Sequence, residues 1–125
     1  FAEAKGVGLN QQGLYTSLDA IAACWQHQSG ITGSGSWNFG SHEAKDEVVI
    51  YGNQGEIRFA VFDDQPVILK NSKGEKQFVI GHPENIQFFH VQNMREHLLG
   101  NIKHPSTGET GLHTAWVMDK ILGRI

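Results

Sequence analysis

The stretch that decides the fold is Ser29-Gly30-Ile31-Thr32-Gly33-Ser34-Gly35-Ser36-Trp37-Asn38-Phe39. In an extended strand, successive side chains point to opposite faces. One face would carry Ile31, Gly33, Gly35, Trp37 and Phe39, and the other Thr32, Ser34, Ser36 and Asn38. Neither face has the Lys and Glu residues that an ordinary solvated strand carries. Glycine, which has no side chain, also lets another backbone come close to the strand. We therefore expect a strand in the middle of a sheet that is covered on both sides.

The neighbouring segments predict an antiparallel meander. Gln28-Ser29-Gly30 has the chemistry of a hairpin turn, which favours a paired strand over residues 15–28, although the Ala, Leu and Gln residues there also suit a helix. Residues 56–62 alternate regularly between two faces, as in a strand. Further strands are predicted over residues 1–9, 46–51, 67–70 and 77–80. The chain thus has about six or seven short strands.

Two helices are predicted at the C-terminal end. Pro83 suits a first helical turn and Gly100 a helix end. At ~100° per residue, five apolar residues between them fall within an arc of about 140°, which predicts a core-facing stripe. They are Phe88, Val91, Met94, Leu98 and Leu99. Ser106 and Glu109 have capping-box spacing for a second helix that ends at Gly123.

Strands first and helices last predict an α+β fold. We expect an open-faced, mainly antiparallel sheet of about six or seven strands, with the two C-terminal helices packed on one face. The uncovered face carries apolar residues too, and large bare apolar patches are rare on monomers. A second copy or a second domain is therefore expected to pack there.

Composition limits the class of protein. The 125 residues fit one domain, and residues 1–125 show no linker or repeat. The net charge of −3, with Lys and Arg scattered singly, argues against nucleic-acid binding. A mean hydropathy of −0.32 and the absence of a signal segment argue against a membrane protein. The expected location is the cytoplasm.

Two single residues, Cys24 and Phe1, limit the interpretation further. Cys24 is the only cysteine, so no internal disulfide can form, and its simplest role is that of a small apolar residue in a strand. The chain begins with Phe1 and not with Met, which indicates a piece of a longer protein.

No motif in the chain predicts a metal, nucleophile or dinucleotide site. His90 and His97 would lie on one helix face but ~10.5 Å apart along the axis, too far to share an ion. The Gly-x-Gly pieces, at Gly33 and at Gly6, lack the third glycine and the following helix of a dinucleotide site. A phosphate bound at the start of the second helix would be repelled by the carboxylate of Glu109. Helix capping is therefore the favoured explanation of the segment from Ser106 to Glu109.

Three groups of residues fall in predicted loops, where binding residues tend to lie. They are Trp37 with Phe39 and His42; His82-Pro83-Glu84-Asn85 with Gln87; and His104-Pro105. A solvated or helix-capping role is the simplest interpretation of each imidazole, and core or interface packing that of Trp37 and Phe39.

Five segments together carry a resemblance to a known family. They are Gly33-Ser34-Gly35-Ser36-Trp37-Asn38-Phe39; residues 47–62 around Tyr51-Gly52-Asn53-Gln54-Gly55-Glu56-Ile57-Arg58-Phe59; His82-Pro83-Glu84-Asn85-Ile86-Gln87; His104-Pro105-Ser106-Thr107-Gly108-Glu109; and Thr114-Ala115-Trp116-Val117-Met118-Asp119. In this order they resemble the C-terminal domain of the Gfo/Idh/MocA oxidoreductases, the superfamily of glucose-fructose oxidoreductase and inositol dehydrogenase. The resemblance covers nearly the whole chain and implies an open-faced sheet with helices on one side.

The resemblance also implies a parent enzyme that transfers hydride between NAD or NADP and a sugar, cyclitol or related small molecule. Three family parts are absent from this chain: the N-terminal Rossmann domain, the Glu-Lys-Pro motif with the catalytic lysine, and the Asp-x-x-x-His element. The chain would then be the substrate-side and oligomerisation domain. By itself it would bind no nicotinamide cofactor and catalyse no reaction.

Site residues follow from the family pattern. The open sheet face would pack against another subunit, with Thr32, Ser34, Ser36, Trp37 and Phe39 as interface candidates. The start of the first helix would approach the substrate pocket, which gives His82, Asn85, Gln87 and His104 as substrate-binding candidates. Some relatives have a substrate-contacting Tyr where this chain has Gln87.

Two other functions stay open at this point. One is a standalone dimeric ligand-binding or scaffold module without redox activity, which a Met shortly before Phe1 would support. A Gly-x-Gly-x-x-Gly element and a Glu-Lys-Pro motif upstream would instead support the oxidoreductase. Hydrolysis by one of the histidines lacks a paired base and nucleophile.

Overall fold

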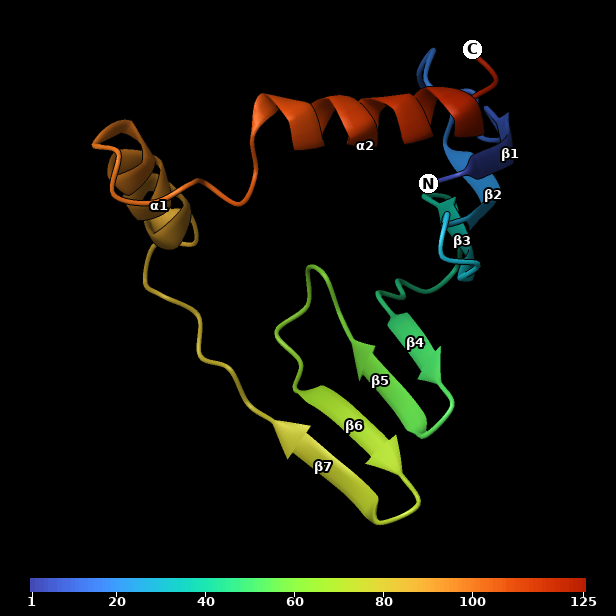
Figure 1. The fold of residues 1–125 in the computed structure, drawn as a ribbon. Coiled ribbons are helices and arrows are strands. Elements are labelled where there is room, and N and C mark those ends of the chain that lie inside the picture. Colours follow the sequence, from blue (N-terminus) through green and yellow to red (C-terminus); the bar gives the residue numbers. More distant parts are fainter. The chain divides into compact units, whose positions relative to one another are not determined.

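The computed structural model describes all residues, 1–125. The chain forms two compact units: unit 1 comprises Phe1–His42 and Lys103–Ile125, and unit 2 comprises Glu43–Ile102 (Figure 1). The elements are β1 (Glu3–Leu9), β2 (Ala20–Gln26), β3 (Thr32–Asn38), β4 (Val48–Gly52), β5 (Gly55–Phe59), β6 (Val67–Asn71), β7 (Gly74–Phe78), α1 (Phe88–Leu98) and α2 (Gly108–Ile121). Every strand pair is antiparallel, which confirms the α+β fold. The single domain over residues 1–125 stays a prediction, because two compact units can belong to one domain.

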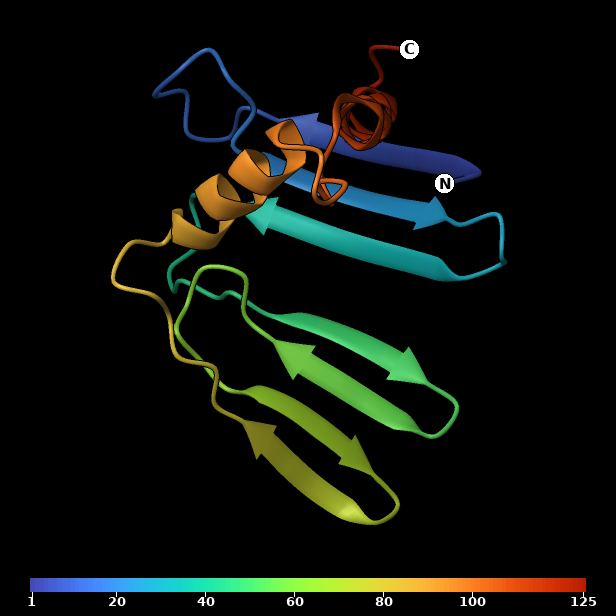
Figure 2. The same ribbon diagram turned by 60° about the vertical axis from the view of Figure 1, so that its left-hand side comes forward.

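The strands form two sheets, where the sequence predicted one. β1, β2 and β3 form a three-stranded sheet in unit 1, and β4 to β7 form a four-stranded sheet in unit 2 (Figure 2). The polar segment between Asn38 and Val48 contains no strand, so hydrogen bonding is interrupted there. The stretch of residues 29–39, which contains β3, therefore lies at the edge of its sheet. The prediction that it lies in the middle of a sheet was wrong.

The predicted hairpin leads into β3. The amide of His27 donates to the carbonyl of Ile31 (2.7 Å), and the amide of Gly30 donates to the carbonyl of His27 (2.9 Å). Gly30 has a φ of 87°, a left-handed conformation that favours glycine. The paired strand β2 is confirmed but begins at Ala20, because Asp19 is used to hold the preceding loop. Its carboxylate accepts hydrogen bonds from the two backbone amides of residues 11 and 12, at 2.6 and 2.9 Å.

On one face of the three-stranded sheet, α2 packs against β1. A Cβ atom at Gly6 would lie 2.7 Å from Ile121, so this glycine lets α2 approach β1 closely. On the same face, a Cβ at Gly33 would lie 2.4 Å from the indole of Trp25, and one at Gly35 would lie 2.8 Å from that of Trp37. The glycines of β3 thus make room for two indoles of the same sheet, and not for another backbone.

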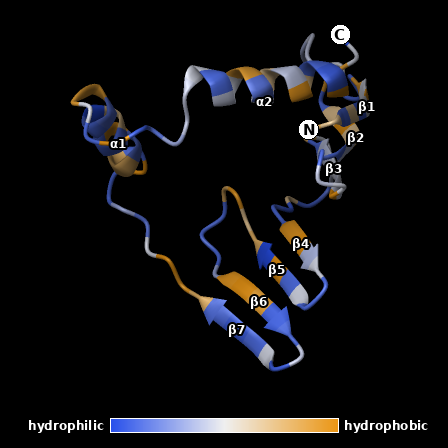
Figure 3. Ribbon diagram, viewed as in Figure 1, coloured by the Kyte–Doolittle hydropathy of each residue, from blue (hydrophilic) through white to orange (hydrophobic).

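The four-stranded sheet has one apolar face. The register places Val48, Ile50, Ile57, Phe59, Val67, Leu69 and Phe78 on that face. The opposite face carries Val49, Tyr51, Glu56, Arg58, Ile68, Lys70, Glu75 and Gln77. Figure 3 shows hydrophobic residues in β4 and β6 and mainly hydrophilic ones in β7. β5 ends at Phe59, earlier than predicted, because the next residues belong to a loop that Asp46 holds.

α1 begins at Phe88, five residues later than Pro83, and has Gln87 as its N-cap residue. Its end is close to the predicted one: Gly100 has a φ of 77°, and its amide donates to the carbonyl of His97 (3.0 Å). The predicted core stripe is not buried. Its five residues are all exposed, Leu98 by 79%, because α1 makes no extensive contact with a strand.

α2 begins one residue later than predicted. The predicted box used Ser106 and Glu109, but the N-cap residue is Thr107, whose amide donates to Oγ1 of Thr110 (2.9 Å). The prediction that Gly123 ends this helix is confirmed, with a φ of 65°. Neither helix is long and apolar enough to cross a membrane.

Candidate functional site

His82 lies in the segment that joins β7 to α1 in unit 2. Its Nε2 atom is 3.3 Å from Oδ1 of Asp64 in the loop between β5 and β6. Both side chains are largely exposed, 60% and 79%, so the pair contributes little to stability. Because Asp64 engages Nε2, the other ring nitrogen, Nδ1, is the one that can contact a ligand.

Asn85 and Gln87 lie next to His82, where the chain enters α1. The backbone carbonyl of Asn85 accepts a hydrogen bond from the amide of Phe88 (2.9 Å), and that of Gln87 accepts one from the amide of Val91 (3.0 Å). Both residues are exposed. Their backbones therefore start the helix while their side-chain amides remain in solvent. The three substrate-binding candidates of unit 2 thus occupy one short exposed segment.

His104, the fourth candidate, belongs to unit 1 and has a different environment. It is only 7% exposed, and no other polar or charged side chain of the protein is buried. Its Nδ1 atom lies 3.0 Å from the amide nitrogen and 2.6 Å from the carbonyl oxygen of Ser106. These contacts fix the turn that leads into α2. This imidazole is buried and bonds to the turn before α2, so it is not solvated, and its contact with a substrate stays a prediction.

The interface candidates do not share one face of the three-stranded sheet. Thr32, Ser34 and Ser36 are exposed on the face away from α2, which we call the open face. Trp37, 46% exposed, lies on the α2 side over Gly35, and Phe39, 79% exposed, follows the end of β3.

Sequence reasoning missed two apolar residues of β1 that belong to the open face. Val7 and Leu9 pair with Ala22 and Ala20 and are 73% and 61% exposed. They line a shallow hollow of about 370 Å³ together with residues of β2 and β3. The alternation of Val7 and Leu9 with Gly6 and Gly8 could have revealed this face.

A cluster of charged residues lies at a cleft of about 250 Å³ in unit 2. Glu47 pairs with Lys45 (3.0 Å) and with Arg58 (3.0 Å), and Arg58 also contacts Glu56 (3.3 Å). Lys45 and then Arg58 hold the pKa of Glu47 below its usual value. Every cation of the cluster already has a carboxylate partner, and the pairs link the segment before β4 to β5. No pattern in the sequence indicates this cluster.

Acidification is expected to release the loop that follows β5. The backbone amides of Phe62 and Asp63 donate hydrogen bonds to Asp46 and lower the pKa of its carboxyl group. A carboxyl group with a lowered pKa stabilises the fold above its unfolded pKa, about 3.9, and this stabilisation is lost as the pH falls through the folded pKa. The amide proton resonances of Phe62 and Asp63 should therefore shift in NMR spectra as the pH falls below about 4.

The control for this prediction is the variant Asp46→Asn, which should lack the low-pH step at both amides. Asp64→Asn, in the same loop, should keep it. Amide shifts of Phe62 and Asp63 that stay constant from neutral pH to the acid limit would contradict the prediction.

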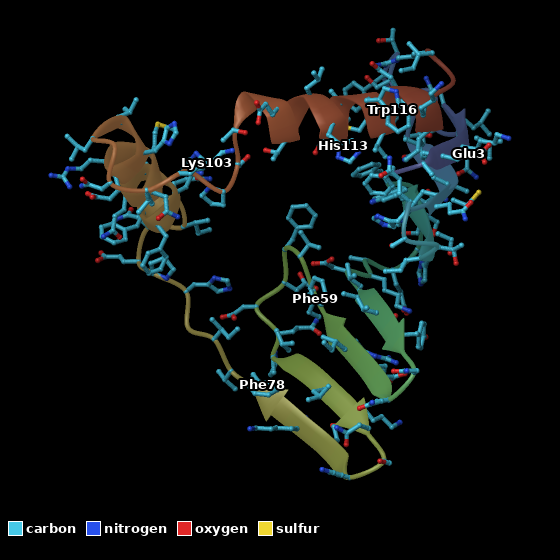
Figure 4. All side chains as sticks on the ribbon, in the orientation of Figure 1. Glu3, Phe59, Phe78, Lys103, His113 and Trp116 are labelled. Carbon is cyan, nitrogen blue, oxygen red and sulfur yellow. The ribbon has the colours of Figure 1, made fainter.

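Aromatic rings join the sheet of unit 1 to α2. The ring centroid of Phe1 lies 6.4 Å from that of Trp25 and 5.3 Å from that of His113, and His113 stacks on Trp116 at 6.3 Å. Lys120 lies over the Trp116 ring, 5.7 Å from its centroid. Figure 4 shows His113 and Trp116 on the same helix.

No group of three or more His, Cys, Asp or Glu side chains is close enough to hold a metal ion.

Comparisons with known proteins relate the chain to larger enzymes. It is 28% identical over 96 residues to Oxidoreductase P35 from Formosa agariphila, a match that covers 77% of this chain and 30% of the relative. The chain is similar to part of an oxidoreductase. No family model matches it.

Two solved structures share the fold. Both carry the provisional name oxidoreductase. The one from Thermotoga maritima superposes with a TM-score of 0.73 and 16% identity, over 96% of this chain and 37% of that protein. The one from Erwinia carotovora atroseptica superposes with a TM-score of 0.52 and 21% identity, over 82% and 34%. The chain thus spans about a third of the length of the proteins it matches.

Proposed function

We propose that the chain is the substrate-side and oligomerisation domain of an NAD- or NADP-dependent oxidoreductase of the Gfo/Idh/MocA type. The observation that carries this proposal is the sequence similarity over 96 residues to a protein named an oxidoreductase, of which the match covers 30%. The fold shared with two further proteins of that provisional name supports it. The other two-thirds would supply the Rossmann domain, the Glu-Lys-Pro motif and the nicotinamide cofactor. The enzyme would be cytoplasmic.

The substrate would be a sugar, a cyclitol or a related polyhydroxylated molecule. Imidazole and amide side chains can donate and accept hydrogen bonds, as recognition of hydroxyl groups requires. His82, Asn85 and Gln87 are exposed and close together in sequence, which suits such a contact. His104 is the fourth substrate-binding residue of this proposal.

The complete reading frame and an activity assay test the function. The frame should encode a Gly-x-Gly-x-x-Gly strand-turn-helix and a Glu-Lys-Pro motif upstream of Phe1. The purified longer protein should reduce NAD or NADP with at least one member of a panel of sugars and cyclitols. A reading frame that starts with a Met shortly before Phe1 would reject the proposal in favour of a standalone binding module.

The chain by itself is expected to bind no nicotinamide cofactor, because the domain that would hold it lies elsewhere in the longer protein. Isothermal titration of the 125-residue chain with NADH should therefore give only heats of dilution, whereas the longer protein should give a saturable signal. Saturable NADH binding by the chain alone would refute this prediction.

A further inference from the structure

The cleft of about 250 Å³ in unit 2 lies where β4 begins and β5 ends, and polar and apolar groups line it together. The ionised carboxylates of Asp46 and Asp63 accept hydrogen bonds. The guanidinium of Arg58 donates them, and the side-chain amide of Gln65 does both. The apolar part of the lining includes Phe59, which is labelled in Figure 4, Pro66 and Ile68.

We propose that this cleft binds a neutral polyhydroxylated molecule of about the size of one sugar ring. A hydroxyl group both donates and accepts hydrogen bonds, so it needs neighbours of both kinds. The cleft offers both kinds, together with apolar surface against which the carbon atoms of a ring can pack. Drug-sized ligands occupy pockets of about 300–1,000 Å³, so this smaller cleft suits a single ring and not a chain of rings.

This inference goes beyond the proposed function, because it adds a binding site that needs no nicotinamide cofactor. The lining of the cleft contains none of the four substrate-binding candidates, which are His82, Asn85, Gln87 and His104. The whole lining belongs to unit 2. The cleft is therefore complete within one compact unit of the chain.

The hydrogen-bonding groups of the cleft are held in place before a ligand binds. Two backbone amides of the loop after β5 donate hydrogen bonds to Oδ2 of Asp46. The guanidinium of Arg58 lies 3.0 Å from Glu47 and 3.3 Å from Glu56. A carboxylate and a guanidinium each have more hydrogen-bonding sites than these contacts use, so both can also bond to a ligand. Groups that are already fixed lose little conformational freedom on binding.

The charges at the cleft argue against an anion or a metal ion as its ligand. The lining carries two cations, Lys45 and Arg58, and three carboxylates, so an anion would meet an excess of negative charge. Both cations already pair with Glu47, at 3.0 Å each, and an anion would have to compete with that carboxylate. The structure has no group of three or more metal-ligating side chains. A neutral ligand can bond to the charged groups without separating the ion pairs.

Two glutamines provide the test and its matched control. The side chain of Gln65 lines the cleft and donates to Oδ2 of Asp63 (3.4 Å), whereas Gln54 is exposed in the turn at the other end of β4 and β5. Gln65→Leu and Gln54→Leu are the same substitution at exposed loop positions. The amide resonances of each variant and of the unmodified chain are followed by NMR during titration. The probes are the neutral molecules glucose and myo-inositol, the anion glucuronate and the cation glucosamine.

At least one neutral probe should shift the amides of residues 44–47, 58–59 and 63–68 to saturation. Gln65→Leu should raise its Kd at least about fivefold, because the variant loses a group that both donates and accepts hydrogen bonds. Gln54→Leu should leave the Kd unchanged. If the amide spectrum of the 125-residue chain is not that of a folded protein, the same titration of the longer protein decides.

Three results would overturn the proposal. The first is the absence of saturable shifts in these segments with both neutral probes. The second is tighter binding of glucuronate or glucosamine than of either neutral probe, which would assign the cleft to an ion. The third is an equal Kd for Gln65→Leu and Gln54→Leu.

The titration is independent of the activity assay. If the longer protein reduces NAD or NADP with a sugar but the amides of the cleft do not shift, the proposed function stands and the inference fails. If a neutral probe binds in the cleft but the longer protein has no such activity, the inference stands and the proposed function fails.

Discussion

Replacing Gly6 with valine is expected to lower the free energy of unfolding of unit 1 by about 2–3 kcal/mol. A Cβ atom at this position would lie 2.7 Å from Cγ2 of Ile121, 2.8 Å from the carbonyl oxygen of Ile121 and 2.9 Å from that of Ala22. Two of these three atoms belong to the backbone, so a change of side-chain rotamer cannot relieve the overlap. The variant must therefore move α2 away from β1.

Tryptophan fluorescence during urea unfolding measures this effect directly. All three tryptophans, Trp25, Trp37 and Trp116, lie in unit 1, so the signal reports on that unit. The control is Gly111→Ala in α2, where a Cβ atom meets nothing within 4 Å. It should raise the free energy of unfolding by about 0.5–1 kcal/mol, because alanine favours the helix. A Gly6→Val variant as stable as the unmodified chain would contradict the close packing of α2 on β1.

Self-association through the open face is expected to be weakened at least about tenfold by Ser34→Arg. The proposed interface should bury more than ~1,000 Å² in total. Ser34 lies on the open face directly opposite Cys24, which in turn pairs with Lys5. An arginine there would place a long cation within the interface, on the edge strand and two strands away from Lys5. The dimer would lose both its close contact and its charge balance.

Sedimentation velocity at increasing concentration measures the association. The rate at which Cys24 reacts with a thiol reagent gives a second, independent measurement. It is the only cysteine and is exposed, so a thiol reagent should react with it slowly in the associated form and quickly in Ser34→Arg. Ser29→Arg, the same substitution in the hairpin turn, should leave both measurements unchanged. An unmodified chain that stays monomeric at high concentration would rule out the proposed interface.

Local sequence signals predicted the elements of this fold well. The hairpin before β3 and the ends of both helices depend on residues close in sequence, such as Gly30, Gly100 and Gly123, whose left-handed conformations glycine favours. The sequence also indicated the alternation of Thr32, Ser34 and Ser36 with the glycines. These features need no knowledge of distant contacts.

The wrong predictions concern contacts between distant residues. The place of β3 at a sheet edge depends on which strands pair, and the role of its glycines depends on where the indole of Trp25 lies. The exposure of the α1 stripe depends on what packs against it, which helical periodicity does not reveal. For the same reason the sequence proposed His82 as a site residue without its partner Asp64, which is 18 positions earlier and in another loop.

The contact between Gly33 and Trp25 has a consequence for how this sheet can evolve. The space that glycine leaves free is filled by the indole, so the two positions share one fixed volume. A larger residue at 33 becomes acceptable only when 25 becomes smaller, and either change alone should be selected against. Related sequences should therefore show these two positions changing together, as a compensating pair.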